Sequence, residues 1–367
     1  MKQTFNVSDP IRLTLHDFHQ SLGANFSELN GAEVVSDYGD VLGEHRALCE
    51  SAGVLDLSFR SRVCLTGNDR VRFLHGQVTN DVKKLGVGQG CYAALTTAKG
   101  KMQSDLNIFC LQDELLLDFE PGLTTLVTER LEKYIVADDV QVVDVTPHYG
   151  LLSVQGPKAE GVVRVLGLFT KMPAAPLSLA KISDATLGEI YLMNHARLGL
   201  VGFDLFVPFA AMGAVVNKLF VAAKSRGGRA CGWSAFEIAR VEAGIPRFCA
   251  DMDETNLASE CGIETQAISY NKGCYIGQEV LNRIHSIGHV NRELRKLRLT
   301  ADAKTLPERG DKLFLNEKEV GYITSAVLSP KQNCIVALGY VRREANVAGT
   351  ELNLRSSSGK SIAAVVS

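Results

Sequence analysis

The pattern of apolar and polar positions predicts a mixture of strands and helices over the first four-fifths of the chain. Alternating apolar positions predict strands, and apolar positions three or four residues apart predict helices. Glycine, asparagine and aspartate separate the runs as turn residues. On this basis we expect strands at 61–67, 91–95, 102–111, 114–119, 150–155, 189–198 and 203–207, and helices at 11–25, 43–51, 70–77, 123–135, 158–166, 210–224 and 235–243. This order is typical of an α+β fold and not of a regular βαβ alternation.

The pattern changes near residue 292, where short β runs separated by turns replace the mixture. These runs lie at 294–299, 312–315, 319–327, 334–340 and 351–354. A strand every ten residues or so is typical of a small barrel or sandwich. We therefore expect domain boundaries near 145 and 290, which gives three domains at 1–145, 146–290 and 291–367.

Composition and charge exclude several classes of protein. Hydrophobic residues make up 46% and charged residues 22% of the 367, so the chain is expected to fold. A net charge of −2 provides no basic field, so we expect no direct nucleic-acid partner. The opening residues 1–10 are polar, and no apolar run reaches the ~18 residues that a membrane span needs. We therefore expect no membrane partner and a cytoplasmic location.

The cysteines favour a reduced protein. There are nine, an odd number, and none is part of a C-x-x-C pair. A disulfide framework or a zinc ribbon would show paired spacing. Most of the nine lie among apolar neighbours, as small buried thiols do. His285 and His289 are four residues apart but lack a third ligand, so we predict no metal site.

The sharpest local feature is the run 270–280, in which Gly273 and Gly277 flank Cys274. Glycines on both sides place the thiol on a tight turn, and a helix can begin at Gly277. Lys272 and the N-terminus of that helix would both favour the thiolate. The spacing leaves equally open that Cys274 only fills space under the turn.

The segment Lys272–Glu279 resembles the signature of YgfZ-type folate-binding proteins, written K-G-C-F/Y-x-G-Q-E. These proteins form a branch of the aminomethyltransferase (glycine-cleavage T-protein) superfamily. Further segments resemble that superfamily and follow in the expected order, at 43–58, 79–82, 240–244 and 321–325. The resemblance implies an α+β fold: a three-domain cloverleaf, with two mixed α/β domains around a central folate cavity and a C-terminal β-barrel.

The resemblance also implies three folate-facing residues. Asp105 matches a carboxylate that faces the folate nitrogens, where it can orient tetrahydrofolate or accept a proton. Asp204 stands where the family usually has Glu, which accepts hydrogen bonds from the amino-pyrimidine edge of the pterin. Tyr92 matches an aromatic position near the cofactor. Taken without the family, Asp105 is equally typical of a solvent-facing strand and Tyr92 of core packing.

Two departures from the aminomethyltransferase pattern point away from transfer chemistry. Phe236 replaces an Arg expected near the substrate or the folate tail, and Phe59-Arg60 replaces the His-Met of the family's D-L-S-H-M. Arg60 could partly restore the lost charge. Our main hypothesis is a tetrahydrofolate-binding accessory protein that supports iron–sulfur cluster assembly or repair in client enzymes, including tRNA-modifying enzymes. Cys274 and Asp105 would be its catalytic residues. One alternative is a tetrahydrofolate-dependent aminomethyltransferase, which Asp105 supports. Another is a folate-binding scaffold that catalyses neither redox nor transfer reactions.

Overall fold

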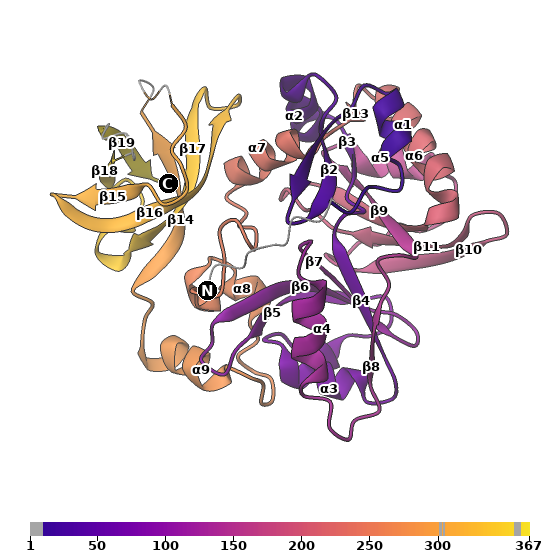
Figure 1. Cartoon of the computed structure of the whole chain (residues 1–367), viewed down its shortest axis with the longest axis horizontal. Coiled ribbons are helices and arrows are strands. Elements are labelled where there is room, and N and C mark those ends of the chain that lie inside the picture. Colours follow the sequence, from indigo (N-terminus) through magenta and orange to yellow (C-terminus); the bar gives the residue numbers. More distant parts are fainter. Residues whose placement is uncertain (1–9, 301–302, 304, 356–360) are drawn as a thin grey trace. The chain divides into compact units, whose positions relative to one another are not determined.

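The computed structural model describes residues 10–300, 303, 305–355 and 361–367. These residues form two compact units, whose elements Figure 1 labels. The first unit takes the chain up to Phe73 together with 82–91 and 106–236, and the second takes 74–81, 92–105 and 237–367. The boundaries expected near 145 and 290 stay predictions. Residues 1–9, where the sequence predicts no signal segment, lie outside the described residues.

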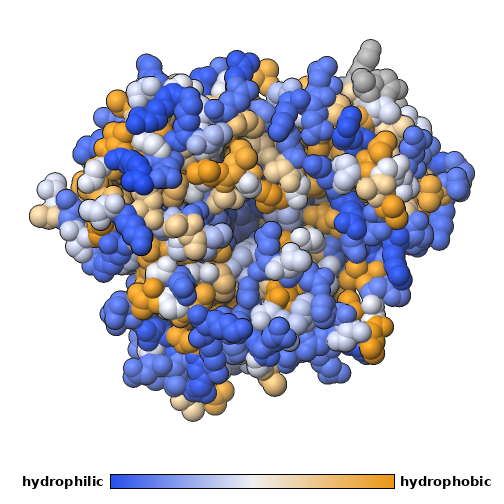
Figure 2. Space-filling view, turned by 180° about the vertical axis from the view of Figure 1, so that it is seen from behind, coloured by the Kyte–Doolittle hydropathy of each residue, from blue (hydrophilic) through white to orange (hydrophobic). Residues whose placement is uncertain are grey.

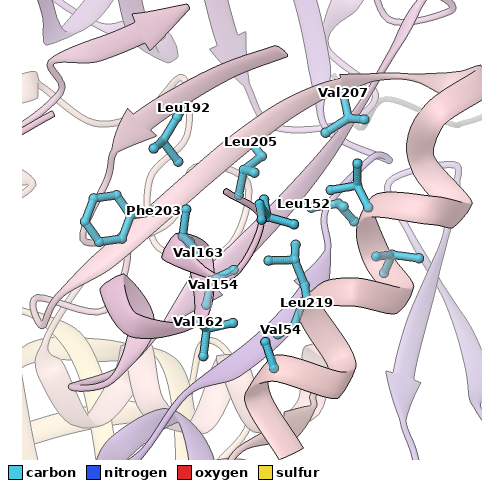
Figure 3. Packing of buried hydrophobic residues seen from close by; sticks show 14 of the residues in the cluster. Val54, Leu152, Val154, Val162, Val163, Leu192, Phe203, Leu205, Val207 and Leu219 are labelled. Atoms are coloured by element: carbon cyan, nitrogen blue, oxygen red, sulfur yellow. The ribbon is translucent and has the colours of Figure 1, made fainter. Parts of the chain in front are cut away.

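A six-stranded sheet with two helices packed on it forms the core of the first unit. Its strands are β3 (Gly53–Asp56), β9 (Tyr149–Gln155), β10 (Leu179–Asp184), β11 (Gly188–Asn194), β12 (Gly202–Pro208) and β13 (Arg229–Ala230), and the helices are α5 (Ala159–Arg164) and α6 (Phe209–Lys224). The strand order is β10-β11-β12-β9-β3-β13, antiparallel except for β3 and β13. Buried residues of α6 recur every three or four positions, so one helix face packs on the sheet. Figure 3 shows Leu219 of α6 in this packing with Val54 and Leu152.

The N-terminal elements correct the helix expected at 11–25. The structure has a short helix α1 (His16–Ser21) and then a hairpin of β1 (Asn25–Leu29) and β2 (Ala32–Asp37). Asn30 and Gly31 both have positive φ, 50° and 81°, as a tight two-residue hairpin turn requires. The Asn-Gly pair was the signal that the sequence reasoning missed. Helix α2 (Val41–Glu50) then follows close to the predicted position.

A second sheet has the order β5-β6-β7-β4-β8, and its strands β5 and β6 are divided between the two units. The bounds are β4 (Ser61–Thr66), β5 (Gly90–Thr96), β6 (Met102–Cys110), β7 (Leu115–Phe119) and β8 (Gln141–Asp144), with helices α3 (Arg70–Gln77) and α4 (Thr124–Glu132). The predicted strands and helices of this region are confirmed, apart from β8. Three of the four β8 residues are exposed, so the strand shows little apolar alternation.

The C-terminal strands form a closed barrel in the order β14-β17-β16-β15-β18-β19. The strands are β14 (Arg292–Leu299), β15 (Lys312–Leu315), β16 (Lys318–Ser329), β17 (Cys334–Arg342), β18 (Glu351–Arg355) and β19 (Ser361–Val366). Pairing of β19 with both β14 and β18 closes the barrel around a core that includes Leu297 and Leu354. The prediction of mixed α/β structure followed by a C-terminal β-barrel is confirmed.

Shorter elements connect these layers. They are the helices α7 (Trp233–Ala243), α8 (Glu264–Ala267) and α9 (Gln278–Ile287), and the single turns η1 (Val82–Lys84), η2 (Ala258–Glu260) and η3 (Arg343–Ala345). Among the described residues, no helix is long and apolar enough to span a membrane. Figure 2 shows one face of the molecule, where hydrophilic residues predominate and apolar ones lie scattered between them.

Candidate functional site

Tyr92 and Asp105 form a hydrogen-bonded pair on neighbouring strands of the second unit. The Tyr92 hydroxyl donates to Oδ2 of Asp105 over 2.8 Å. Along β6, Met102, Ser104 and Leu106 are buried while Asp105 is half-buried, because successive side chains of a strand point to opposite faces. The phenol therefore orients a carboxylate that is set apart from the core. The structure thus brings together two residues that the sequence analysis had treated separately.

Asp204 of β12 lies in the first unit, where it is 1% exposed and held by an arginine and a histidine side chain. Its Oδ2 accepts hydrogen bonds from Nδ1 of His195 and Nε of Arg197, both over 2.8 Å. Its Oδ1 is buried and has no hydrogen-bond partner among the described residues. A buried acceptor without a donor is costly, so the environment of Oδ1 is unusual for a folded protein.

A chain of buried ion pairs extends from Arg197 through Asp118 to Arg60. Arg197 Nη2 lies 3.0 Å from Oδ2 of Asp118, and Arg60 donates from Nε to Oδ1 of Asp118 over 2.8 Å. Arg60 also pairs with Glu120. Arg60 is therefore committed to two buried carboxylates, and the suggestion that it replaces the charge missing at Phe236 gains no support from these contacts.

Electrostatics keeps these buried carboxylates ionised. Burial alone would raise the pKa of Asp204, but Arg197 and His195 outweigh burial and hold the pKa below its usual range. The pKa of Asp118 is likewise lowered because Arg60 and Arg197 outweigh its burial. Burial and the neighbouring Arg197 lower the pKa of His195, which favours the neutral imidazole. Asp204 is thus a fixed, negatively charged acceptor.

The sequence reasoning did not identify His195, Arg197 or Asp118. A signal existed for Asp118, the single charge inside the apolar run 115–119, because a charged residue is almost never fully buried unless it is paired. His195 and Arg197 lie in the loop between β11 and β12, and only the pairing of those strands shows that they meet Asp204. No sequence spacing reveals that contact.

The segment 272–279 lies in the second unit and is anchored by its lysine. Nζ of Lys272 donates to the backbone oxygens of His75, Val78 and Asn80 over 2.6, 2.7 and 2.7 Å. The carbonyls at the C-terminal end of helix α3 and just beyond it therefore gain a charged donor, as such orphan groups need. Lys272 is itself buried. The lysine thus has a structural task that the sequence analysis did not foresee.

The same segment packs against the hairpin of β5 and β6. Gly277 has a φ of 92°, and a Cβ there would lie 2.6 Å from Oγ1 of Thr96, so only glycine fits. The Thr96 hydroxyl donates to the carbonyl of Ile276 over 2.8 Å. The Tyr275 ring is buried with the Lys272 ammonium 4.8 Å from its centroid. Packing therefore accounts for three residues of the segment, Lys272, Tyr275 and Gly277.

Cys274 stands on this anchored turn. The structure describes all nine cysteines as free thiols, and Cys274 is the exposed one among them. The accessible thiol expected from the flanking glycines is found. Cys274 belongs to the second unit, as does the Tyr92–Asp105 pair on strands β5 and β6, whereas Asp204 belongs to the first unit. The functional roles assigned to Cys274, Asp105, Tyr92 and Asp204 stay predictions.

Comparisons with known proteins cover nearly the whole chain. Residues 15–272 match the GCVT N-terminal domain, and residues 292–367 match the glycine cleavage T-protein C-terminal barrel domain. An aminomethyltransferase of Mycolicibacterium paratuberculosis is 28% identical over 348 residues, which cover 93% of this chain and 91% of that protein. One from Halalkalibacterium halodurans is 27% identical over 356 residues, 96% and 95% of the two chains.

The fold has a solved counterpart. The crystal structure of glycine cleavage system aminomethyltransferase T from Bartonella henselae superposes with a TM-score of 0.86 at 24% identity, covering 97% of this chain and 96% of that one. At this identity the likeness shows the fold alone.

These findings overturn the main functional hypothesis. The relatives that match along the chain carry the name aminomethyltransferase, and nothing in them supports iron–sulfur cluster maintenance or tRNA processing. The error came from the eight residues around Cys274, of which Lys272 and Gly277 already have structural roles in their contacts with residues 75–80 and 96. With both of its domains in order, the chain belongs to the glycine cleavage T-protein family.

Proposed function

We propose that this protein is a tetrahydrofolate-dependent aminomethyltransferase, which moves a one-carbon unit from an aminomethylated carrier to tetrahydrofolate. The observation that carries the proposal is the Tyr92–Asp105 pair, an oriented carboxylate in a chain that aligns with aminomethyltransferases over 93% of its length. Bound tetrahydrofolate would supply the nitrogen that accepts the one-carbon unit. A cytoplasmic location is part of the same proposal.

Asp105 has the geometry of a proton acceptor. Its Oδ2 already accepts the Tyr92 hydroxyl over 2.8 Å, which fixes the plane of the carboxylate. A positioned carboxylate accelerates proton transfer by roughly 10²–10⁴-fold. In this proposal Asp105 takes the proton that the accepting nitrogen loses, and Tyr92 keeps Asp105 in position.

The acceptor oxygens of Asp204 suit the N–H donors of a pterin edge. Such an edge presents N–H donors, and the buried Oδ1 of Asp204 lacks a donor among the described residues. The other oxygen is already occupied by His195 and Arg197, so Asp204 offers one free acceptor atom. In this proposal Asp204 orients the pterin through Oδ1, with Arg197 and His195 keeping the carboxylate ionised.

The test is a transfer assay with purified full-length protein, aminomethylated lipoyl carrier protein and tetrahydrofolate. Methylenetetrahydrofolate and ammonia are measured as products. We expect wild type to form both, Asp105→Asn to lower kcat by about 100-fold or more, and Tyr92→Phe to lower it less. Asp113→Asn, which removes an exposed turn carboxylate of the same kind, is the matched control and should retain full activity.

Asp204→Asn separates binding from chemistry, because loss of the pterin contact should raise KM for tetrahydrofolate more than it lowers kcat. The proposal fails if wild type forms no methylenetetrahydrofolate, or if Asp105→Asn retains wild-type kcat. Tight binding of tetrahydrofolate in a titration, combined with no transfer, would establish the scaffold alternative instead.

A further inference from the structure

A groove of about 790 Å³ lies on the first unit, lined by parts of α2, α6 and the loop that leads into β13. Both helices contact β13, and Figure 1 shows the three elements close together. The lining residues differ from those around Asp204 and belong to the first unit, whereas Asp105 belongs to the second. The proposed transfer chemistry therefore leaves this groove without a task.

Positive charge predominates in the groove. Its charged lining consists of four cations, Arg46, Lys158, Lys224 and Arg229, and two carboxylates, Asp40 and Glu50. Arg229 is taken up by Asp40, at 2.6 Å. The side chains of Arg46 and Lys224 are exposed, and neither makes a hydrogen bond or ion pair within the described part of the chain. Two cations are thus available to an anionic ligand, in a protein whose net charge is −2.

Another part of the groove lining is apolar and is formed by Tyr38, Phe220 and Leu22. The rings of Tyr38 and Phe220 meet edge to face, with centroids 6.3 Å apart and an interplanar angle of 88°. Leu22, which also lines the groove, is 48% exposed. An aromatic or apolar body could pack against these three residues.

A buried relay fixes the Tyr38 ring. The Tyr38 hydroxyl lies 2.8 Å from Nδ1 of His19, and Nε2 of His19 lies 2.9 Å from Oδ2 of Asp56. Both ring nitrogens of His19 are thus engaged, Nδ1 by the Tyr38 hydroxyl and Nε2 by the Asp56 carboxylate. Burial and the nearby Asp56 raise the pKa of Tyr38, so the hydroxyl stays protonated. The aromatic wall is therefore rigid before any ligand arrives, which limits the entropy lost on binding.

We propose that this groove binds a small molecule of the nucleoside diphosphate class, in which an aromatic ring is joined to at least two negative charges. The ring would pack on Tyr38, Phe220 and Leu22, and the phosphates would pair with Arg46 and Lys224. Charge-assisted hydrogen bonds from arginine and lysine to phosphate are among the strongest in proteins. The groove volume lies within the range of ~300–1,000 Å³ that small-molecule sites occupy.

The experiment is isothermal titration of the full-length protein at low ionic strength with three probes: ADP, inorganic pyrophosphate and adenosine. We expect ADP to bind one site per chain, more tightly than either fragment. The double variant Arg46→Gln/Lys224→Gln should weaken ADP binding by about tenfold or more, the loss of roughly 1.4 kcal/mol. Lys171→Gln removes an exposed lysine outside the groove and should leave the affinity unchanged.

Leu22→Ala tests the apolar wall. It should weaken ADP binding and leave pyrophosphate binding unchanged, because only the ring contacts Leu22 in this arrangement. Three results would overturn the proposal: no saturable ADP binding at millimolar concentration, equal affinity of the double variant and wild type, or pyrophosphate binding as tight as ADP binding. Activity in the transfer assay does not enter these measurements, so this proposal and the proposed function can fail independently.

Discussion

Replacing Lys272 by methionine tests whether the segment 272–279 is chiefly structural. The buried ammonium donates to three backbone carbonyls, those of His75, Val78 and Asn80, over 2.6–2.7 Å. Methionine has a similar length but no donor, so each carbonyl loses this partner. A buried acceptor that loses its donor costs about 1–3 kcal/mol, and partial access of water to three neighbouring acceptors favours the lower end. We therefore expect Lys272→Met to lower the free energy of unfolding by about 3 kcal/mol.

The assay is urea denaturation followed by circular dichroism, with amide hydrogen exchange as a local readout. Faster exchange should centre on residues 74–80, the stretch that receives the Lys272 bonds. Lys99→Met is the matched control, since Lys99 is exposed in the neighbouring hairpin turn and its replacement should change stability by less than about 0.5 kcal/mol. A loss below about 1 kcal/mol for Lys272→Met, with unchanged exchange at 74–80, would refute the structural interpretation.

Two further predictions concern pH and thiol reactivity. Asp118 and Asp204 have folded-state pKa values below the ordinary 3.8. The unfolded chain therefore binds more protons, and the stability these residues contribute is complete above that value and lost as pH falls through their folded-state pKa values. The lowered pKa of His195 acts in the same direction below pH 6.5. In urea denaturation, the stability of Asp118→Asn should depend less steeply on pH below 3.8 than that of wild type. An equal slope would contradict the role given to Asp118. In native protein, a thiol-specific reagent should modify the exposed Cys274 before the buried cysteines, which are Cys64, Cys110, Cys231 and Cys261. Cys274→Ser should remove this fast first phase of the reaction. A fast phase that persists in the variant would contradict the expected order.

Much of the secondary structure could be predicted from the sequence because its elements bury one face. The helix at 70–77 and the strand at 312–315 have the predicted bounds. Elements with little burial were missed, such as β8, whose residues are largely exposed. The hairpin at 25–37 was missed for a different reason, because the turn chemistry at Asn30-Gly31 was not recognised and residues 26–42 were left without an assignment.

The candidate site was less accessible to sequence reasoning. Tyr92 and Asp105 were singled out through the resemblance to the aminomethyltransferase superfamily, and the alternating pattern predicted only the two strands that carry them. The network around Asp204 could not be found, since Asp118 and Arg197 are 79 residues apart and meet only after the chain folds. Long-range ion pairs leave no periodic signal in a sequence.

The segment around Cys274 shows why a short motif is weak ground for a function. Lys272 serves carbonyls almost 200 residues earlier in the chain, and Gly277 is required by a close approach to Thr96. These demands restrict the residue types as strictly as catalysis would, and sequence alone cannot separate the two causes. Cys274 is exposed, and so is Glu279, so the anchoring contacts account for neither side chain. Cys274→Ser therefore tests a role of the thiol separately from the structural contribution of Lys272.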